Sequence, residues 1–530
     1  MKVLVTDKID KAASNILENI AIVDNLPTLP EDELAKVIGQ YDAVMVRSQS
    51  KINKKIIDSA SSLKIIGRAG VGVDNIDVEA ATQKGIIVVN SPDGNTNAAA
   101  EHTVALMLAL SRNIPQAVST TKNGLWERSK YTGIEVYGKT LGIIGLGKIG
   151  SHVAQVAISL GMKVVVCDPY TTEESVEKIG AKYIHSLDEF WGLCDFISIH
   201  APKTRETAYL INKNTLNRMK NGVRIINCAR GGIIDEAALK EAILSGQVAG
   251  AAIDVFENEP DIKSSPLLEC GDKVILTPHL GASTEEAQLN VAIDVAEQIK
   301  EVLTGGTARA AVNIPALKPE VLEPVKDYMQ ISENLGELVS QISKGNLKSI
   351  SINVCGNLAE LNISPLEVAI LKGIFSSTIE GVNYVNAPII AKKRGINIIT
   401  SKSPKDCSFI GSITVTLTTD QDENKATGAL LTENMPRIVA INEYNMSIEP
   451  EKHVLIIPHE NKPSMIAKVA AVIGENNINI NRMHVAQKTN KKDNVSIMII
   501  NTETKVDDFT LTKIEAIDGI SSAKYIHLSA

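Results

Sequence analysis

The sequence predicts an α/β protein with two doubly wound parallel-sheet domains, followed by an α+β domain and a ferredoxin-like domain. Three observations support this fold class. Short apolar strands alternate with helical stretches from residue 1 to about 97, a glycine-rich turn joins a strand to a helix at residues 141–150, and a β-α-β-β-α-β order begins near residue 453. At roughly 150 residues per domain, the 530 residues fit three or four such units.

The first unit is predicted from apolar runs at its strands. These runs are MKVLVTD, AVMVRS, LKIIGRAG and GIIVVN. Helical stretches separate them, as in a small doubly wound domain. AAAEHTVALMLALSR, which follows, predicts a long helix that crosses to the next domain.

The second unit begins at TLGIIGLGKIG, where an apolar strand runs into a glycine turn and then a helix. In such a βαβ unit Gly145 makes the tight turn, Gly147 lets the backbone approach a pyrophosphate, and Gly150 lets the helix pack on the strand. Asp168 ends the next strand and offers a carboxylate to the adenosine ribose. Because a carboxylate there repels a 2′-phosphate, we expect NAD rather than NADP as the cofactor.

Composition argues against several classes of partner. The formal net charge is −8 and the basic clusters are short, so no nucleic-acid partner is expected. Six scattered cysteines form no C-x-x-C pair, which indicates reduced thiols rather than disulfides or a metal site. No apolar run approaches the roughly 20 residues of a membrane span. We therefore expect a cytoplasmic protein that binds no membrane and no metal.

Three predicted strand ends in the second unit carry side chains suited to chemistry. Arg230 follows VRIINCA, Glu259 follows AAIDVFEN, and His279 follows KVILTP. Ligands of parallel sheets gather at these carboxyl ends. An imidazole beside a carboxylate can take the proton of an alcohol, and a guanidinium can hold a substrate carboxylate in two hydrogen bonds. Singly each residue has an ordinary surface interpretation, but together they favour oxidation of a hydroxy acid.

The motifs GLGKIG, NCARGG, DVFENEP and TPHLG together resemble the NAD-dependent D-2-hydroxyacid dehydrogenases, a family with Rossmann-like domains. GRAGVGVDNID and NSPDGNTNAAAEHT resemble its phosphoglycerate dehydrogenase branch, which oxidises D-3-phosphoglycerate in the first step of L-serine biosynthesis. The resemblance implies that Arg230, Glu259 and His279 are catalytic. It also implies substrate contacts through the backbone of Val71 and Gly72, and through Arg47 with Ser48 for the phosphate.

The same resemblance implies a set of cofactor contacts that extends beyond the glycine turn. The expected cofactor-binding residues are Gly145, Gly147, Lys148, Ile149, Gly150, Asp168, Ala201, Cys228, Ala229 and Asp254.

In that family the cofactor domain is inserted into the substrate domain, and a returning helix closes the latter. STEEAQLNVAIDVAEQIKEVLTG would be this helix. The expected domains are 1–97 with 285–316 for the substrate, 98–284 for NAD, 317–450 as an intervening domain, and 453–530 as a regulatory domain. A homo-oligomer, a dimer or a tetramer, is expected.

The last unit resembles the ACT domains that sense amino acids. The resemblance implies L-serine as an effector held by His459, Asn461 and Asn479, whereas a purely structural interpretation makes the first two caps of a turn. The chain departs from the family pattern at Pro463-Ser464, where Pro-Gly is usual, so a side chain stands at the expected effector turn.

The AKKRG cluster in the intervening region has two interpretations. Lys392, Lys393 and Arg394 form an anion site if they follow the family's allosteric domain, or else a solvated basic turn.

Two other functions stay open from the sequence. A glycerate or hydroxypyruvate reductase of the same family would need neither Arg47 nor a regulatory tail. An NAD-sensing binding protein is a further alternative, since corepressors share this core and can keep the catalytic triad. The regulatory tail argues against both.

Overall fold

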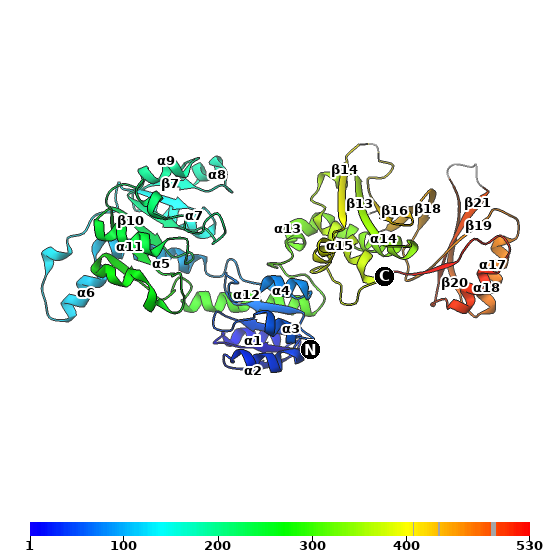
Figure 1. The fold of residues 1–530 in the computed structure, drawn as a ribbon, viewed down its shortest axis with the longest axis horizontal. Helices are drawn as coiled ribbons and strands as arrows, with labels where there is room; N and C mark the ends of the chain where they lie inside the picture. Colours follow the sequence, from blue (N-terminus) through cyan, green and yellow to red (C-terminus); the bar gives the residue numbers. More distant parts are fainter. Residues whose placement is uncertain (406, 433–434, 489–493, 530) are drawn as a thin grey trace.

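The computed structural model describes the chain from residue 1 to 530 except 406, 433–434, 489–493 and 530. Four sheets organise it, and each belongs to one lobe of the ribbon in Figure 1. The first two sheets are parallel, the third is mixed and the fourth is antiparallel. The predicted fold class is therefore confirmed. Among the described residues, no helix combines the length and apolar composition needed to cross a bilayer.

The first lobe is a five-stranded sheet of order β2-β1-β3-β4-β5 with helices on both faces. Its strands are β1 (Lys2–Val5), β2 (Ile22–Asn25), β3 (Ala43–Val46), β4 (Ile65–Arg68) and β5 (Ile87–Val89). Its helices are α1 (Lys11–Leu17), α2 (Glu31–Val37), the 3-10 turn η1 (Ile38–Gln40), α3 (Lys54–Ser59) and α4 (Val78–Gln83). The four predicted strands are present. Strand β2 was not predicted, because it is an edge strand with no buried residue.

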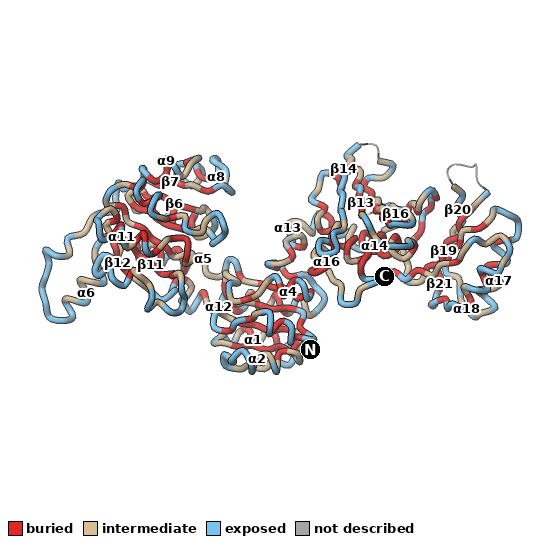
Figure 2. Tube along the Cα trace, in the orientation of Figure 1, coloured by how far each residue is buried: buried red, intermediate tan, exposed pale blue. Residues whose placement is uncertain are grey.

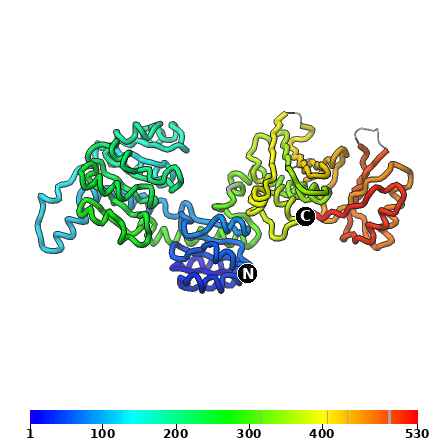
Figure 3. The backbone as a smooth tube through the Cα atoms, in the orientation of Figure 1, coloured from blue at the N-terminus to red at the C-terminus, as the bar shows by residue number. Residues whose placement is uncertain are grey.

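The chain leaves this lobe through α5 (Thr96–Arg112), as predicted, and continues into α6 (Ile114–Lys122) and η2 (Arg128–Tyr131). It returns through α12 (Glu285–Leu303), whose apolar face packs on α1 and β4. Gly67 in β4 makes this approach close, because a Cβ there would lie 2.5 Å from Cγ1 of Val295. Figure 3 shows the green returning helix beside the blue N-terminal chain.

The second lobe is a seven-stranded parallel sheet of order β12-β11-β10-β9-β6-β7-β8. Its strands are β6 (Thr140–Ile144), β7 (Lys163–Cys167), β8 (Lys182–Tyr183), β9 (Phe196–Ile199), β10 (Val223–Asn227), β11 (Val248–Ile253) and β12 (Val274–Leu276). Its helices are α7 (Lys148–Ser159), α8 (Glu173–Lys178), α9 (Leu187–Phe190), η3 (Trp191–Leu193), α10 (Lys213–Leu216), α11 (Glu236–Ser245), η4 (Ile262–Ser264) and η5 (Pro266–Lys273). The order reverses beside β6, where parallel sheets bind ligands.

The third lobe packs α14 and α15 on a six-stranded mixed sheet of order β14-β13-β15-β16-β17-β18. Its helices are η6 (Pro315–Leu317), α13 (Pro319–Leu322), η7 (Glu323–Tyr328), α14 (Met329–Ile342), η8 (Asn357–Glu360), α15 (Ser364–Ser376) and α16 (Ala387–Lys393). Its strands are β13 (Leu347–Gly356), β14 (Asn397–Ser403), β15 (Gly411–Thr419), β16 (Glu423–Leu430), β17 (Pro436–Ile441) and β18 (Tyr444–Ile448).

The fourth lobe has the predicted β-α-β-β-α-β order. It comprises β19 (His453–Glu460), α17 (Met465–Glu475), β20 (Ile480–Gln487), β21 (Val495–Thr502), α18 (Asp508–Glu515) and β22 (Lys524–His527). The two helices cover one face of this sheet. Val454, Ile497 and Ile526 on the other face join the core of the third lobe, so one apolar cluster runs through both. Figure 2 colours the buried residues of both lobes red.

Candidate active site

His279 and Glu259 meet at the carboxyl ends of the second sheet. Nδ1 of His279 lies 2.7 Å from Oε2 of Glu259, and the other carboxylate oxygen accepts the backbone N–H of Phe256 at 2.8 Å. Burial raises the pKa of Glu259, but the hydrogen bonds from His279 and Phe256 outweigh it and hold the pKa below its ordinary value. Glu259 is therefore a carboxylate near neutral pH and orients the imidazole.

His279 sits in a tight turn that Asp254 holds. The backbone N–H of His279 donates to the carbonyl of Asp254 at 2.9 Å, and those of Leu280 and Gly281 donate to its carboxylate at 2.8 and 2.9 Å. His279 has φ of 54°, a left-handed conformation that costs a non-glycine residue free energy. Several hydrogen bonds to one buried residue thus keep the imidazole in place.

Arg230 follows β10 and is positioned by its own turn. Its carbonyl accepts Nδ2 of Asn227 at 3.0 Å, and its Nη1 donates to the carbonyl of Ala229 at 2.7 Å. Gly231, next in the chain, has no room for a side chain, because a Cβ would collide with the carbonyl of Phe256. The turn therefore fixes where the guanidinium leaves the sheet.

The guanidinium of Arg230 reaches the first lobe. Its Nε lies 3.4 Å from Oδ2 of Asp74, and a Cβ at Gly72 would collide with the guanidinium. The arginine predicted to be catalytic thus lies against the Gly72 backbone that was predicted to hold the substrate carboxylate. Asn90 donates to the carbonyl of Val71 and supports the same loop.

Arg68 adds a cation that was not predicted from the sequence. It ends β4, two residues before Gly70, and its Nε is buried without a partner among the described residues. Burial, then the like charge of Arg230, lowers the pKa of Arg68 to about 10, so the side chain stays charged at neutral pH. The sequence signal that could have identified Arg68 is its position inside GRAGVG, a motif of which only the backbone was predicted to contact the substrate.

Arg47 and Ser48 follow β3 at the neighbouring strand end. The Arg47 backbone N–H donates to Asp7 at 2.8 Å, and Nη1 donates to the carbonyl of Lys8 at 3.0 Å. Arg47 is half-buried and Ser48 is exposed. Because the charge of Arg47 acts on Arg68, the two cations belong to one region of the first lobe.

The glycine turn fits a dinucleotide. Gly145 has φ of 91° and lies against the backbone of His200, whereas the space beside Gly147 is open, so a phosphate can approach the start of α7 there. Gly150 packs on the carbonyl of Gly145. Asp168 accepts the backbone N–H of Leu146 at 2.6 Å and so ties β7 to this turn.

The other residues predicted to contact the cofactor lie around the same sheet edge. Lys148 and Ile149 open α7, and Nζ of Lys148 lies 2.5 Å from Oδ1 of Asp93, which precedes α5. Ala201 follows β9, and Cys228 and Ala229 follow β10. The residues of the predicted cofactor set thus gather at the carboxyl ends of adjacent strands.

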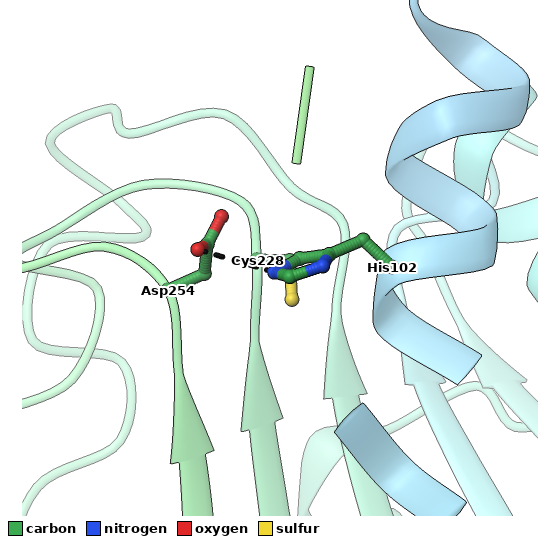
Figure 4. A group of neighbouring side chains, drawn as sticks. All are labelled: His102, Cys228 and Asp254. Carbon is green, nitrogen blue, oxygen red and sulfur yellow. Dashed lines mark ion pairs between the residues drawn. The ribbon is translucent and has the colours of Figure 1, made fainter. Parts of the chain in front are cut away.

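Cys228 and Asp254 also form a group with His102 from α5, which Figure 4 shows. Nε2 of His102 lies 3.2 Å from Oδ1 of Asp254, and the three potential ligand atoms lie within 4.8 Å of one another. Burial raises the pKa of Cys228 to about 12, so this thiol is neutral. Asp254 already accepts hydrogen bonds at both oxygens, so the arrangement is a hydrogen-bonded set.

In the fourth lobe His459 and Asn461 lie at the end of β19, whereas Asn479 precedes β20 at the opposite end of the sheet, so one chain does not bring the three predicted effector residues together. His459 is buried, Asn461 is exposed, and Nδ2 of Asn479 donates to Glu503 at 2.7 Å. Ser464 precedes α17 in the left-handed region with φ of 73°. The backbone there keeps the conformation that glycine favours, while the serine adds a side chain.

The AKKRG cluster ends α16. Lys392, Lys393 and Arg394 are all exposed, and the amide of Arg394 caps the helix. This position is compatible with both the anion site and the solvated turn.

Comparisons with known proteins identify the family. Residues 104–281 match the model described as D-isomer specific 2-hydroxyacid dehydrogenase, NAD binding domain, and residues 324–442 match the D-3-phosphoglycerate dehydrogenase intervening domain. The D-3-phosphoglycerate dehydrogenase of Synechocystis sp. is 48% identical over 529 residues, which cover 99% of this chain and 95% of that protein. The chain belongs to the D-3-phosphoglycerate dehydrogenases of the D-2-hydroxyacid dehydrogenase family. NAD is accordingly its cofactor.

Other members of the family show how far the likeness extends. The Methanocaldococcus jannaschii D-3-phosphoglycerate dehydrogenase is 42% identical and matches 100% of both chains. Solved structures that match cover 57% to 61% of this chain. A D-lactate dehydrogenase from Aquifex aeolicus, complexed with NAD and lactic acid, is 30% identical with a TM-score of 0.51, covering 57% of this chain and 96% of its own.

Proposed function

We propose that the chain oxidises D-3-phosphoglycerate to 3-phosphohydroxypyruvate with NAD, the first step of L-serine biosynthesis. The observation that carries the proposal is the 2.7 Å contact between His279 and Glu259, at the same edge of the sheet from which Arg230 leaves β10. Full-length similarity to two D-3-phosphoglycerate dehydrogenases supports the choice of substrate.

His279 acts as the general base in this proposal. Glu259 engages Nδ1, so Nε2 is the nitrogen that faces the substrate hydroxyl and takes its proton. Arg230 holds the substrate carboxylate and polarises the reacting oxygen, and Gly72 brings the backbone of the first lobe to the same place. The bound cofactor supplies the hydride acceptor.

Cofactor binding is assigned to the glycine turn and the strand ends beside it. The start of α7 receives the pyrophosphate beside Gly147, where the structure leaves open space. Asp168 faces the adenosine ribose and disfavours a 2′-phosphate. Cys228, Ala229 and Asp254, which follow β10 and β11, complete the proposed cofactor set.

Arg47, Ser48 and Arg68 provide the phosphate specificity. A phosphate dianion needs cationic partners that glycerate lacks, and these residues gather at neighbouring strand ends of the first lobe. We expect Arg47→Ala to lose a charge-assisted bond worth about 1.5 to 3 kcal/mol, which raises KM for 3-phosphoglycerate roughly tenfold or more. The weak rate with glycerate should stay almost unchanged. Equal losses for both substrates would show that Arg47 does not bind the phosphate.

One assay compares the candidate functions. NADH absorbance is followed with 3-phosphoglycerate, glycerate and D-lactate in parallel, and L-serine is then added. Turnover of 3-phosphoglycerate above the others supports the proposal. A preference for glycerate would favour the reductase alternative, and no turnover of any hydroxy acid would favour an NAD-sensing binding protein.

L-serine is the proposed effector of the fourth lobe. The support is the resemblance of the lobe to amino-acid sensors, because within one chain Asn479 lies at the opposite end of the sheet from His459 and Asn461. Ser464 weakens this part of the proposal, because its side chain stands at the turn that approaches the effector.

Lys392, Lys393 and Arg394 are proposed as an anion site of the third lobe. Titration with serine and with inorganic phosphate by calorimetry tests both.

A homo-oligomer, dimer or tetramer, is also proposed. The support is the exposed apolar surface of the segment that follows α5. Helix α6 has no buried residue, and Trp126 and Leu125 are 87% and 54% exposed. Monomers rarely leave such an apolar patch uncovered. Sedimentation of the full chain tests it, and a monomer would contradict it.

We place the protein in the cytoplasm, although two Arabidopsis thaliana relatives are described as chloroplastic.

A further inference from the structure

We propose that His102 is a positioning residue for hydride transfer, acting through Asp254 on the turn that carries His279. The proposal rests on the proposed role of His279 as the base. His102 belongs to α5, the helix that leaves the first lobe and packs on the second, and none of the sequence motifs assigned it a role.

His102 contacts the buried carboxylate of Asp254 directly. Nε2 of His102 lies 3.2 Å from Oδ1 of Asp254 and 3.4 Å from Oγ1 of Thr277. The imidazole side chain is 20% exposed and the Asp254 side chain is fully buried. A buried carboxylate needs hydrogen-bond donors for the lone pairs it offers, and His102 is the side-chain donor that comes from outside the second sheet.

Asp254 in turn holds the segment around the base. Besides His102, the donors to its carboxylate all come from the segment that surrounds His279: Thr277 Oγ1 at 2.6 Å, Leu280 N at 2.8 Å and Gly281 N at 2.9 Å. The Asp254 carbonyl accepts the amide of His279 at 2.9 Å. Asp254 therefore holds the chain on both sides of His279, and rotation of the Asp254 carboxylate would move the turn that carries His279.

This clamp opposes backbone strain at His279. A non-glycine residue at φ of 54° persists only where its surroundings fix it. If Asp254 lost the donor from α5, its carboxylate could turn, and His279 could relax toward a more favourable backbone conformation. The distance from the imidazole to the substrate hydroxyl would then increase, which slows proton and hydride transfer without removing a substrate contact.

The geometry also separates this role from an ion site. The ligand atoms of His102, Cys228 and Asp254 lie close together, as Figure 4 shows. The Asp254 oxygens are, however, occupied by N–H and O–H donors. An ion would have to displace these donors and free the turn that they hold.

The experiment compares His102→Leu with His102→Gln in the full-length enzyme. Leucine keeps the volume without a donor, whereas the glutamine amide can donate from near the Nε2 position. We expect kcat of His102→Leu to fall about tenfold or more, the size expected for a lost hydrogen bond to a charged group. KM for the hydroxy acid should change less than about twofold, because the substrate contacts remain. His102→Gln should recover most of kcat.

Three further measurements guard against a simple folding defect. The deuterium isotope effect on kcat with a substrate deuterated at C2 should rise in His102→Leu, because the chemical step becomes slower relative to product release. His185→Gln removes an exposed histidine of the same lobe and should leave kcat unchanged. Thr277→Val combined with His102→Leu should lose less than the product of the single losses, since both donors act through Asp254.

Several outcomes would overturn the proposal. An unchanged kcat in His102→Leu would do so, and so would equal losses in the leucine and glutamine variants. A loss confined to NADH affinity, measured by fluorescence, would assign His102 to cofactor binding instead. The wild-type assay tests the proposed function separately, because the His102 comparison can use whichever 2-hydroxy acid the enzyme oxidises.

Discussion

The two halves of the chain use buried and half-buried polar groups differently. In the first two lobes, Glu259 and His279 stand at strand ends and keep 34% and 47% of their side chains exposed. In the last two lobes, Glu333 on α14 is 3% exposed and is bound by Lys372 at 2.6 Å and by the hydroxyl of Tyr384 at 2.5 Å. The partly exposed pair of Glu259 and His279 keeps polar atoms available to bind a ligand. The polar atoms of Glu333 are instead all used in contacts with the side chains that pack on α14.

The same contrast extends to the end of α14. Glu337 accepts the backbone N–H and the hydroxyl of Ser529, and Gln341 exchanges two hydrogen bonds with the backbone of His527. These contacts tie β22 and the segment after it to the third lobe. We therefore expect changes in the first half to alter turnover more than stability, and changes around α14 to alter stability more than turnover.

The largest effect is expected for His279→Ala. Removal of a general base typically lowers kcat by roughly 10²- to 10⁴-fold, while NAD binding and the melting temperature should change little. Steady-state kinetics and calorimetric titration with NAD measure both. Near-normal turnover would remove His279 from its assigned role.

The next largest effect is expected in the reactivity of the cysteine thiols, which should differ between the two halves of the chain. Burial raises the pKa of Cys194 and of Cys228 to about 12. Burial also acts on Cys407, but hydrogen bonds from Cys355, Ser412 and a backbone N–H outweigh it and lower its pKa below the ordinary value. Because only the thiolate reacts, iodoacetamide at pH 8 should label Cys407 about 10³-fold faster than the other two.

Peptide mass spectrometry over time measures this order. Raising the pH above 8 should narrow the difference, because the thiolate fraction of Cys194 and Cys228 keeps rising until the pH approaches 12, whereas that of Cys407, whose pKa is lowered, levels off first. Cys407→Ser serves as the control. Early labelling of Cys228 would contradict the burial argument.

A smaller effect, on stability, is expected for Lys372→Met. It leaves Glu333 buried without its cation, which costs about 3 kcal/mol, the lower end for a broken buried pair because the lysine is 24% exposed. The melting transition of the last two lobes should move to lower temperature in scanning calorimetry. Adding Glu333→Gln should recover much of the loss. Lys348→Met, at an exposed lysine of β13, is the matched control, and an equal shift there would contradict the prediction.

The smallest effect is expected for Ser464→Gly. Glycine adopts φ of 73° without the steric cost that a Cβ brings, so the fourth lobe should gain about 0.5 to 1 kcal/mol of stability. Inhibition by serine should also become tighter, because the side chain leaves the proposed effector turn. Asn477→Gly, at a left-handed residue beyond α17, should add stability without changing the serine response.

The sequence predicted the catalytic half well because its function depends on local patterns. A strand, a glycine turn and a helix are contiguous in TLGIIGLGKIG, and His279 and Arg230 directly follow apolar strands. Arg68 and His102 were missed for the opposite reason. Their roles depend on neighbours far along the chain, Arg230 for one and Asp254 for the other, which no short motif contains. The domain boundaries stay predictions.

The third lobe was the hardest part to predict from the sequence. In α14, Ile331, Leu335, Leu338, Val339 and Ile342 recur at helical spacing and form an apolar face, but Ser332, Glu333 and Asn334 are buried as well, which no apolar pattern predicts. In β14 the alternation that marks a strand is absent, because six of its seven residues are exposed. Strand β14 forms because its pairing with β13 overrides the local pattern, and the polar residues of α14 are buried because neighbouring elements cover them.

The apolar cluster shared by the last two lobes limits how the protein can be divided. A fragment that begins near residue 453 would carry Val454, Ile497 and Ile526 on an uncovered sheet face. Such a surface favours aggregation or pairing with another chain. Effector binding measured on that fragment alone would be affected by contacts that this uncovered face makes and that the full chain does not. A fragment intended for binding studies should therefore begin before α14 and keep both lobes.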